Sequence, residues 1–582
     1  MITIKNNETV ASFTPGLIKQ NKGTLALFVV AAAVAALLTM ATALSVTDFL
    51  QLIFPTENGV TSFVAPNANP VLRLLQRLYV LLAAQGPQRA LVLYALLLLL
   101  IYGMKNLFSY TAVVTFAKFK ISIMASLRNL VHRSVLRQDF AGWSAQQQGQ
   151  WLAVMSSDMA EYETNVLDAL SLLLQALLTM VIYLLMLLYL DWKLTLVVVI
   201  VMGVGTFLLS ASRRLKRQSR NLQDLNGHLI STIQETLDSL KEIKAATAIE
   251  FVNRRQREQN AVFSRRRVAV YRLIDAASPL SDFLGNTIVV AILIIGAFRV
   301  LGDAASMSPS MFISYVMIYV LLLTPIKDLS NAIAQFKKGR GVEERISERL
   351  VSSDEPQHVE SPAPGTIESI ALSDVTFAYG SQEVIAHFSH RLTMHRHTAV
   401  VGPSGSGKTT FGRIVVGLLQ PQRGQVLING APTTAVQRRG RIAYIPQDPM
   451  LFNDTVEGNI RFGRPWVTDE QIEAAIRMAQ VQPIVDNLPQ GLQTPIGDGG
   501  SRLSGGERQR VSIARALVGN PDIVVMDEAT AALDAETEQH FIQSLQEAME
   551  SRTLIVIAHR ASTIARCHTR LAINAPKTTN NI

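Results

Sequence analysis

Long apolar stretches alternate with polar, basic stretches through residue 340 of the chain. We read the apolar runs as membrane-spanning helices, because about 20 residues at helical rise cover a bilayer core of about 30 Å. The predicted spans lie at residues 24–54, 90–116, 166–190, 194–209, 282–301 and 311–333. An even number of spans leaves both ends of this region on the same side of the membrane.

The polar stretches between the spans indicate the orientation. Residues 118–163 and 213–272 are rich in lysine and arginine, and basic loops favour the cytoplasmic side. Each stretch is long enough for a pair of helices that extends beyond the membrane, whereas the outward turn at 191–193 is short. The pattern predicts an all-α transmembrane domain over residues 1–340, with six spans, long cytoplasmic helical loops and both termini in the cytoplasm. No cleavage site follows a short apolar core, so we expect no cleaved signal peptide.

Beyond residue 340 the pattern changes to short apolar runs separated by polar turns. A charged and proline-containing stretch at 341–366 predicts a linker. Short apolar runs at 398–401, 523–527 and 553–558 read as buried strands. The pattern predicts a soluble domain that begins near residue 367, followed by a polar, disordered tail over 574–582.

The composition agrees with a membrane protein. Of the 582 residues, 49% are hydrophobic and only 17% are charged, whereas about 25% is usual for a soluble domain. The formal net charge of +9 comes largely from basic clusters beside the apolar runs. These clusters favour basic cytoplasmic loops over nucleic-acid binding. The single cysteine, Cys567, excludes an intrachain disulfide.

A glycine-rich turn between a strand and a helix is the strongest chemical motif. Its residues are Gly402, Pro403, Ser404, Gly405, Ser406, Gly407, Lys408, Thr409 and Thr410. Glycines let backbone N–H groups face phosphate oxygens, and the helix that follows adds partial positive charge. The motif predicts a P-loop in which Lys408 reaches the β/γ-phosphates and the Thr409 hydroxyl binds Mg²⁺.

Two carboxylates, Asp527 and Glu528, stand at the end of the apolar run at 523–527. Asp527 is expected to hold Mg²⁺ through water, and Glu528 to polarise the attacking water as the general base. His559 follows the next apolar run, where it would contact the γ-phosphate and hold the attacking water.

Ser504, Gly505, Gly506 and Glu507 precede a helical pattern and predict a second anion site at a helix start. Two anion sites on one domain make sense if they face different nucleotides. The chain has one such domain, so we expect it to pair with a second chain, by default as a C₂ homodimer.

The order of these motifs resembles the ABC transporter family, and this resemblance implies an α/β P-loop ATPase domain over residues 367–573. The series contains Tyr379, the P-loop, Gln447, the Ser504–Glu507 signature, the Asp527–Glu528 pair, Asp534 and His559. The resemblance implies that each ATP lies between the P-loop of one domain and the signature of another, where Asp534 also contributes. It implies that Tyr379 stacks on adenine and that Gln447 couples Mg²⁺ to the membrane contacts. It also implies further strands and a closing helix after residue 573, which this sequence lacks.

The membrane half is similar to the exporter branch of that family. The residues that carry this similarity are Asp139, Phe140, Gly149, Ser157 and Asp158 in the first inward loop and Lys244 and Glu250 in the second. The stretch 494–500 resembles one that contacts the membrane domain, although Asp498 stands where exporters usually have glutamate. The whole chain is most similar to bacterial lipid A or phospholipid flippases and multidrug exporters, which places it in the inner membrane.

No spacing of residues in the sequence identifies the substrate. Lys105 lies near the middle of the second span, where it would either contact an anionic headgroup or pair and snorkel. Arg299 lies near an outer end, which favours snorkelling. We therefore expect ATP-driven export or flipping of a lipid or amphipathic substrate, with lipid A-like molecules first and drugs second. An ATP-gated channel or sensor is the alternative of a different class, and intact Glu528 and His559 argue against it.

Overall fold

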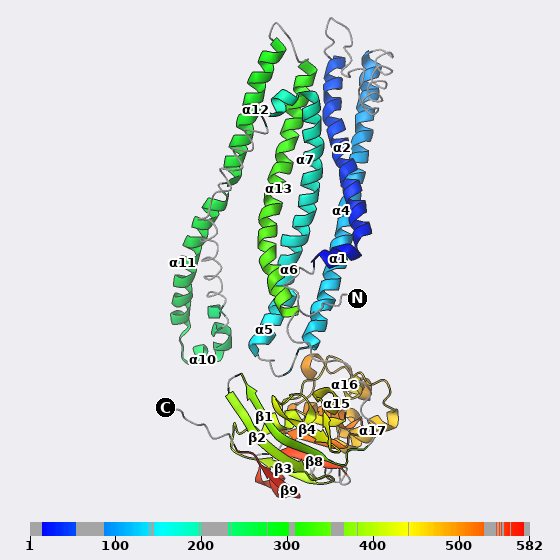
Figure 1. Cartoon of the computed structure of the whole chain (residues 1–582), viewed down its shortest axis with the longest axis vertical. Helices are drawn as coiled ribbons and strands as arrows, with labels where there is room; N and C mark the ends of the chain where they lie inside the picture. Colours follow the sequence, from blue (N-terminus) through cyan, green and yellow to red (C-terminus); the bar gives the residue numbers. More distant parts are fainter. Residues whose placement is uncertain are drawn as a thin grey trace. The chain divides into compact units, whose positions relative to one another are not determined.

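The computed structural model divides into two compact units, each of which is described here by itself. The helical unit contains residues Met1–Val131 and Ala153–Leu350, and the α/β unit contains His132–Leu152 and Val351–Ile582. The structure describes residues 14–53, 87–138, 140, 145–196, 198, 231–233, 235–275, 277–301, 309–350, 366–380, 382–439, 441–528, 543, 546, 549, 552–558 and 560–574. Figure 1 shows their secondary structure.

Helices form the described part of the helical unit. They are α1 (Thr14–Gln20), α2 (Lys22–Ile53), α4 (Pro87–Leu136), α6 (Met159–Tyr162), α7 (Ala169–Leu190), α10 (Leu240–Ala245), α11 (Ile249–Asp275), α12 (Ala277–Leu301) and α13 (Pro309–Leu350). Helix α5 (Ala145–Ala153) belongs to the α/β unit up to Leu152. At 1.5 Å per residue the 50-residue α4 is about 75 Å long, more than twice a bilayer core.

Four helices among the described residues are long and apolar enough to cross a membrane. They cover the predicted spans at 24–54, 90–116, 166–190 and 311–333, and the shorter apolar helix Gly285–Val300 falls within the fifth. The span predicted at 194–209 lies mostly outside the described residues. In the polar stretch that follows this span, the structure describes helices α10 and α11.

Helices α7 and α13 run side by side and form the centre of the helical unit (Figure 1). Their outer parts share a buried cluster with α12 that includes Leu187, Tyr315 and Tyr319. Farther along α13, a Cβ built on Gly339 would come within 2.6 Å of Val166 Cγ2 and 2.8 Å of the Asn165 carbonyl oxygen. The two segments therefore approach so closely that only glycine fits at this position.

Two π-helical segments interrupt the run from α5 to α7. They are η2 (Val154–Asp158) and η3 (Glu163–Asp168). Each carries an acidic side chain that pairs with a neighbouring helix: Lys120 Nζ of α4 lies 3.0 Å from Asp168 Oδ1, and Arg345 Nη2 of α13 lies 2.7 Å from Asp158 Oδ1. These ion pairs tie the interrupted helix to both of its neighbours.

Helix α13 continues ten residues into the predicted linker at 341–366. Val342, Ile346 and Leu350 repeat every four residues and are buried. The run of charged residues around them suggested a linker, but its apolar positions form one helical stripe. The limits of the linker and of the domains on either side stay predictions.

The outer turn after α7 is held by Asp191. Its carboxylate accepts hydrogen bonds from the backbone N–H groups of Lys193 and Leu194 at 2.9 and 3.0 Å, and it pairs with Arg299 of α12. Arg299 was expected to snorkel, but the structure gives it a carboxylate partner.

Two sheets organise the α/β unit. An antiparallel sheet has the order β2-β1-β4-β5, and a parallel sheet has the order β6-β7-β8-β3-β9. The strands are β1 (Ile370–Tyr379), β2 (Gln382–Leu392), β3 (His397–Val401), β4 (Arg423–Ile428), β5 (Ala431–Thr433), β6 (Ile442–Ile445), β7 (Ile523–Asp527), β8 (Thr553–Ile557) and β9 (Thr569–Ala572). Every residue of β7 and β8 is buried, as expected for strands inside a parallel sheet.

Helices flank these strands. They are α14 (Lys408–Val416), α15 (Ala435–Arg438), α16 (Val456–Arg461), α17 (Asp469–Met478), α18 (Gln482–Asp486), α19 (Gly505–Leu517) and α21 (Ala561–Ala565), with 3₁₀ turns at η4 (Gly491–Gln493) and η5 (Asp498–Gly500). The strands predicted at 398–401, 523–527 and 553–558 are confirmed as β3, β7 and β8. The predicted tail beyond Asn574 lies outside the described residues.

The close approach at Gly339 predicts that replacing this glycine lowers stability. Gly341 on the same helix provides the control. Gly339→Ala places a methyl group against the Asn165 carbonyl and Val166, and overpacking of this kind costs about 1–3 kcal/mol. Gly341 lies on the same helix with nothing within 4 Å of a built Cβ, so Gly341→Ala gains up to about 1 kcal/mol of helix propensity. Thermal unfolding of the two variants in detergent should shift in opposite directions. A common shift would contradict the packing argument.

Candidate functional site

The glycine-rich turn joins β3 to α14, as the sequence predicts. Gly407 is the N-cap of α14 and has φ 95°, a left-handed conformation that favours glycine. A Cβ there would also lie 3.0 Å from Val384 Cγ1 and 3.1 Å from its carbonyl oxygen. The first turn of α14 therefore opens directly onto the loop, with its backbone N–H groups directed at the loop interior.

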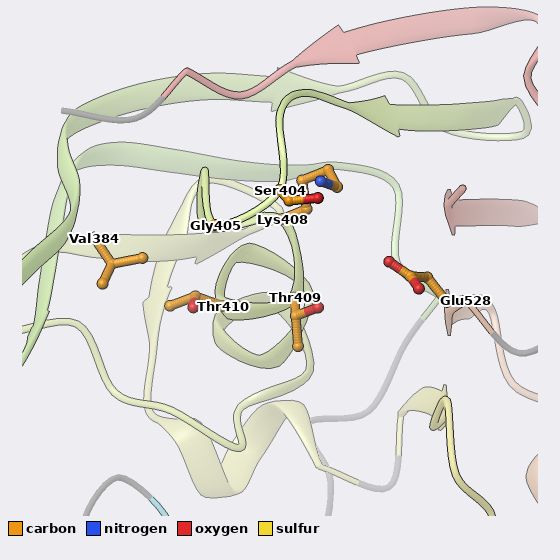
Figure 2. Close-up of a pocket in the computed structure, with 8 residues that line it drawn as sticks. Val384, Ser404, Gly405, Lys408, Thr409, Thr410 and Glu528 are labelled. Carbon is orange, nitrogen blue, oxygen red and sulfur yellow. The ribbon is translucent and has the colours of Figure 1, made fainter. Parts of the chain in front are cut away.

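A cavity of about 270 Å³ lies over this turn. Figure 2 shows Lys408, Ser404 and Gly405 on the loop side and Glu528 across from Thr409. The lining consists of Val384, Ser404, Gly405, Gly407, Lys408, Thr409, Thr410 and Glu528. Ser406 Oγ is buried and has no hydrogen-bond partner among the residues that the structure describes. A loop with a buried donor and exposed amides is suited to phosphate oxygens.

Lys408 is the charged group of this loop. Its Nζ donates to the carbonyl oxygens of Gly402 and Pro403 at 3.0 and 2.9 Å, and the side chain is only 6% exposed. Among the described residues no carboxylate pairs with Lys408, and a buried charge of this kind favours an anion nearby.

The Asp527 carboxylate is fixed through both oxygens. Thr409 Oγ1 donates to Oδ1 at 2.9 Å, and the Tyr444 hydroxyl donates to Oδ2 at 2.8 Å. Burial and, next, the Asp527 charge raise the pKa of Tyr444, so this hydroxyl stays protonated and remains a donor. No motif in the sequence points to Tyr444, which is the next-to-last residue of β6 and lies beside β7, the strand that ends at Asp527.

Glu528 and Gln447 meet at the edge of the cavity. Gln447 Nε2 donates to Glu528 Oε2 at 3.2 Å, and the backbone N–H of Glu528 donates to the Ile557 carbonyl at 3.1 Å. Glu528 has φ 47°, a left-handed conformation that costs a non-glycine residue about 1–3 kcal/mol and is concentrated at functional sites. In this conformation the Glu528 side chain lines the cavity, while its backbone N–H is hydrogen bonded to Ile557 of β8.

The oxygen ligands at this edge fit Mg²⁺. Mg²⁺ prefers hard oxygen ligands and keeps several waters of its own. The Thr409 hydroxyl, the Asp527 carboxylate and the Gln447 amide offer such oxygens, and the first two are already hydrogen bonded to each other.

Ser504 begins α19 with a capping box. Its Oγ accepts the Glu507 backbone N–H at 3.4 Å, and Glu507 Oε2 accepts the Ser504 N–H at 2.7 Å. Glu507, predicted to contact nucleotide, is thus engaged in ordering the helix start, beside the N–H groups of Gly505 and Gly506. None of these residues lines the cavity over the P-loop within the described part of the chain.

Tyr379 ends β1 and also lies outside the cavity lining. Its ring packs edge-on against Phe377, with the centroids 5.0 Å apart, and the residue is 39% exposed. Asp498 of the stretch after Thr494 accepts a hydrogen bond from Asn453 Nδ2 at 2.6 Å. Asp534 and His559 lie outside the described residues, so their predicted roles stay predictions.

Lys105 belongs to the helical unit. It is half-buried on α4, and its Nζ lies 5.9 Å from the centroid of the Tyr102 ring. Within the described ranges, no carboxylate forms an ion pair with it. Exposed apolar side chains surround it along the helix, among them Met104 and Leu107.

Two protein-family models match the chain. The model described as "ABC transporter" matches residues 385–531, and the model described as "ABC transporter transmembrane region" matches residues 25–326. The second match covers more than half of the chain.

Curated relatives match over most of the chain. The "ATP-dependent lipid A-core flippase" of Desulfotalea psychrophila is 29% identical over 81% of this chain and 83% of its own length. The protein of the same name from Burkholderia pseudomallei strain 1710b is 33% identical over 69% of this chain and 68% of its own length. A solved bacterial Atm1-family ABC exporter with ATP bound has a similar fold, with a TM-score of 0.75, 23% identity and coverage of 96% of this chain and 94% of its own.

Lys408→Ala should lower ATP affinity by at least about tenfold, because a hydrogen bond to a charged group contributes about 1.5–3 kcal/mol. A fluorescent ATP analogue titrated onto the purified protein measures this. Lys408 is the only lysine between Lys338 and Lys577, so peptide mapping after amine acylation reports its protection directly. We expect ATP to protect it. Unchanged affinity, or acylation insensitive to ATP, would remove Lys408 from the site.

Proposed function

We propose that this chain, which belongs to the ABC transporter family, flips or exports a lipid or other amphipathic molecule across the cytoplasmic membrane of a bacterium. It is a multi-pass membrane protein whose ATPase domain binds ATP and couples its hydrolysis to transport. The observation that carries the proposal is one chain that joins membrane-length apolar helices to a P-loop cavity faced by Glu528.

Within the ATP site we assign Glu528 as the general base. Its carboxylate faces the P-loop cavity, and Gln447 holds it by one oxygen. Thr409, Gln447 and Asp527, the last through water, would hold Mg²⁺, which when bound neutralises charge on the phosphates. His559 would contact the γ-phosphate and hold the attacking water, and Tyr379 would stack on adenine.

The signature supports an ATP site shared between two copies. The amides at the start of α19 form an anion site that does not line the P-loop cavity among the described residues. We therefore propose a homodimer in which Ser504, Gly505, Gly506, Glu507 and Asp534 of one copy close over the ATP on the P-loop of the other.

Lipid A-like molecules are the substrate class that we favour. The relatives that span most of the chain are named for lipid A-core flipping. Lys105 supports this choice, because an ammonium among exposed apolar side chains suits an anionic headgroup with acyl chains. The basic inward loops support an orientation with the ATPase domain and both termini in the cytoplasm. A multidrug exporter is the second candidate, supported by the same apolar surroundings of Lys105.

Glu528→Gln should still bind ATP and should hydrolyse it at least about a hundredfold more slowly, because a general base contributes about 10²–10⁴-fold. The measurement is ATPase activity of the protein in lipid nanodiscs. Turnover at the wild-type rate in this variant would overturn the assignment of the base. Absence of ATPase activity in the unchanged protein would instead favour a channel or sensor that ATP merely gates.

The same nanodiscs separate the substrate classes. Lipid A and a cationic drug are added in turn, and only stimulation that Glu528→Gln abolishes is counted. Stimulation by lipid A alone, reduced in Lys105→Gln, is the expected result. Stimulation by the drug alone would favour the multidrug exporter.

If two copies share the ATP site, removal of two similar helix N-caps should affect ATP-dependent dimerisation differently. Ser504 begins α19 and Thr468 begins α17, each with a complete capping box. Loss of either cap in Ser504→Ala or Thr468→Ala should cost about 1 kcal/mol of stability. Only Ser504→Ala should weaken the ATP-dependent approach of two labelled copies, measured by energy transfer in the Glu528→Gln background. Equal loss in both variants would indicate a fold effect and contradict the shared site.

A further inference from the structure

Lys120 of α4 holds two carboxylates that an α-helix would separate. Its Nζ lies 3.1 Å from Glu163 Oε1 and 3.0 Å from Asp168 Oδ1. Residues five positions apart on an α-helix point about 140° away from each other, because each residue turns the helix by about 100°. Glu163 and Asp168 are the first and last residues of η3, and π-helical hydrogen bonds run from i to i+5. The π turn therefore brings both carboxylates to one side, where a single ammonium group reaches them.

Helix α13 leaves room for this turn. A π turn holds more residues than an α turn, because its hydrogen bonds span five residues instead of four, so its backbone is wider. Asn165 and Val166 lie in the middle of η3, and a Cβ built on Gly339 of α13 would come within 2.8 Å of the Asn165 carbonyl oxygen and 2.6 Å of Val166 Cγ2. Two neighbours, Gly339 of α13 and Lys120 of α4, thus fit the π form of η3.

The ion pairs of Arg345 lack this dependence on a π turn. Arg345 Nη2 lies 2.7 Å from Asp158 Oδ1 and 3.4 Å from Glu161 Oε2. These two acids are three residues apart, a spacing that an α-helix already places on one face. Arg345 therefore pairs with the same interrupted helix as Lys120 does, but only the contacts of Lys120 require η3.

We propose that η3 is a switchable turn, which Lys120 holds in its π form and which converts to an α turn when that contact is released. Single π turns inside α-helices are rare and occur frequently at functional sites. Conversion of η3 would rotate the helix before it by about 100° relative to α7, so Asp158 would leave Arg345 and Lys120 would keep one carboxylate. This switch goes beyond the proposed function, because it concerns the rotation of one helix and not what the chain binds or hydrolyses.

Deletion of Thr164, an exposed residue inside η3, produces a form locked as an α-helix. Glu163 and Asp168 then stand four residues apart, about 40° from each other on an α-helix, so Lys120 still reaches both and the flanking helices keep their faces. This variant should unfold near the temperature of the unchanged protein. Deletion of Leu177 is the matched control, because α7 is α-helical throughout and the deletion turns its two halves by about 100°. It should unfold far lower, and equal losses in the two variants would overturn the proposal.

Gly339→Ala reports on the same turn from α13. In the unchanged chain the added methyl group meets the Asn165 carbonyl and lowers the unfolding temperature. In the Thr164 deletion the turn has lost its extra residue, so the same substitution should lower that temperature much less. Equal losses in the two backgrounds would show that the close approach does not come from the π turn, and would overturn the proposal.

Amide hydrogen exchange measures the switching itself. The amides of residues 163–169 are followed by mass spectrometry in full-length protein in lipid nanodiscs. Lys120→Gln should speed their exchange about threefold, as expected for the loss of a partly exposed ion pair. Arg345→Gln should leave it unchanged, because the contacts of Arg345 do not need the π turn. Equal acceleration by both variants, or none by Lys120→Gln, would overturn the proposal.

A last arm compares protein with and without ATP and Mg²⁺ in the Glu528→Gln background, and only this arm rests on the proposed function. ATP should protect the P-loop amides of residues 402–410 in the full chain and in the Thr164 deletion. It should change the exchange of residues 163–169 in the full chain alone. Protection of 402–410 with no change at 163–169, or with an equal change in the deletion, would overturn the switch. Absence of protection at 402–410 would instead overturn the proposed function.

Discussion

The ATP site depends on one buried carboxylate at the end of a buried strand. Asp527 ends β7, between β6 and β8, and both of its oxygens accept hydroxyl hydrogen bonds. A carboxylate that is 2% exposed is costly to bury unless it is fully hydrogen bonded. Thr409 and Tyr444 meet that requirement and come from different elements. The same two bonds therefore stabilise the buried carboxylate and fix the P-loop relative to the parallel sheet.

Much of this site follows from the sequence because its parts are local. The P-loop, Asp527 and Glu528 each directly follow or end an apolar run, so the strand pattern alone places them at one edge of a parallel sheet. Tyr444 reaches Asp527 from a strand that is distant in the chain, and no spacing rule reveals such a contact. The left-handed backbone of Glu528 is likewise set by its hydrogen bond to Ile557, a tertiary constraint.

In the helical unit, too, the sequence predicts features that are local in the chain and does not predict those that depend on packing. Apolar length predicts the spans, since a bilayer demands it of any single helix. The helix through 341–350, the Arg299–Asp191 pair and the close approach at Gly339 depend on which faces meet. The helix through 341–350 was predicted as part of a linker, because charged residues dominate its composition and its apolar stripe, Val342, Ile346 and Leu350, is narrow.

The hydrogen bonds of the site also bear on how it would cycle. Lys408 donates to two loop carbonyls, and Thr409 and Tyr444 donate to Asp527. A phosphate group that takes Lys408 replaces its hydrogen bonds to neutral carbonyl oxygens with hydrogen bonds to an anion. The net gain is then smaller than the gross interaction. A modest net gain favours release of the nucleotide after hydrolysis. For a transporter such release matters, because only binding free energy that differs between conformations can drive a change between them.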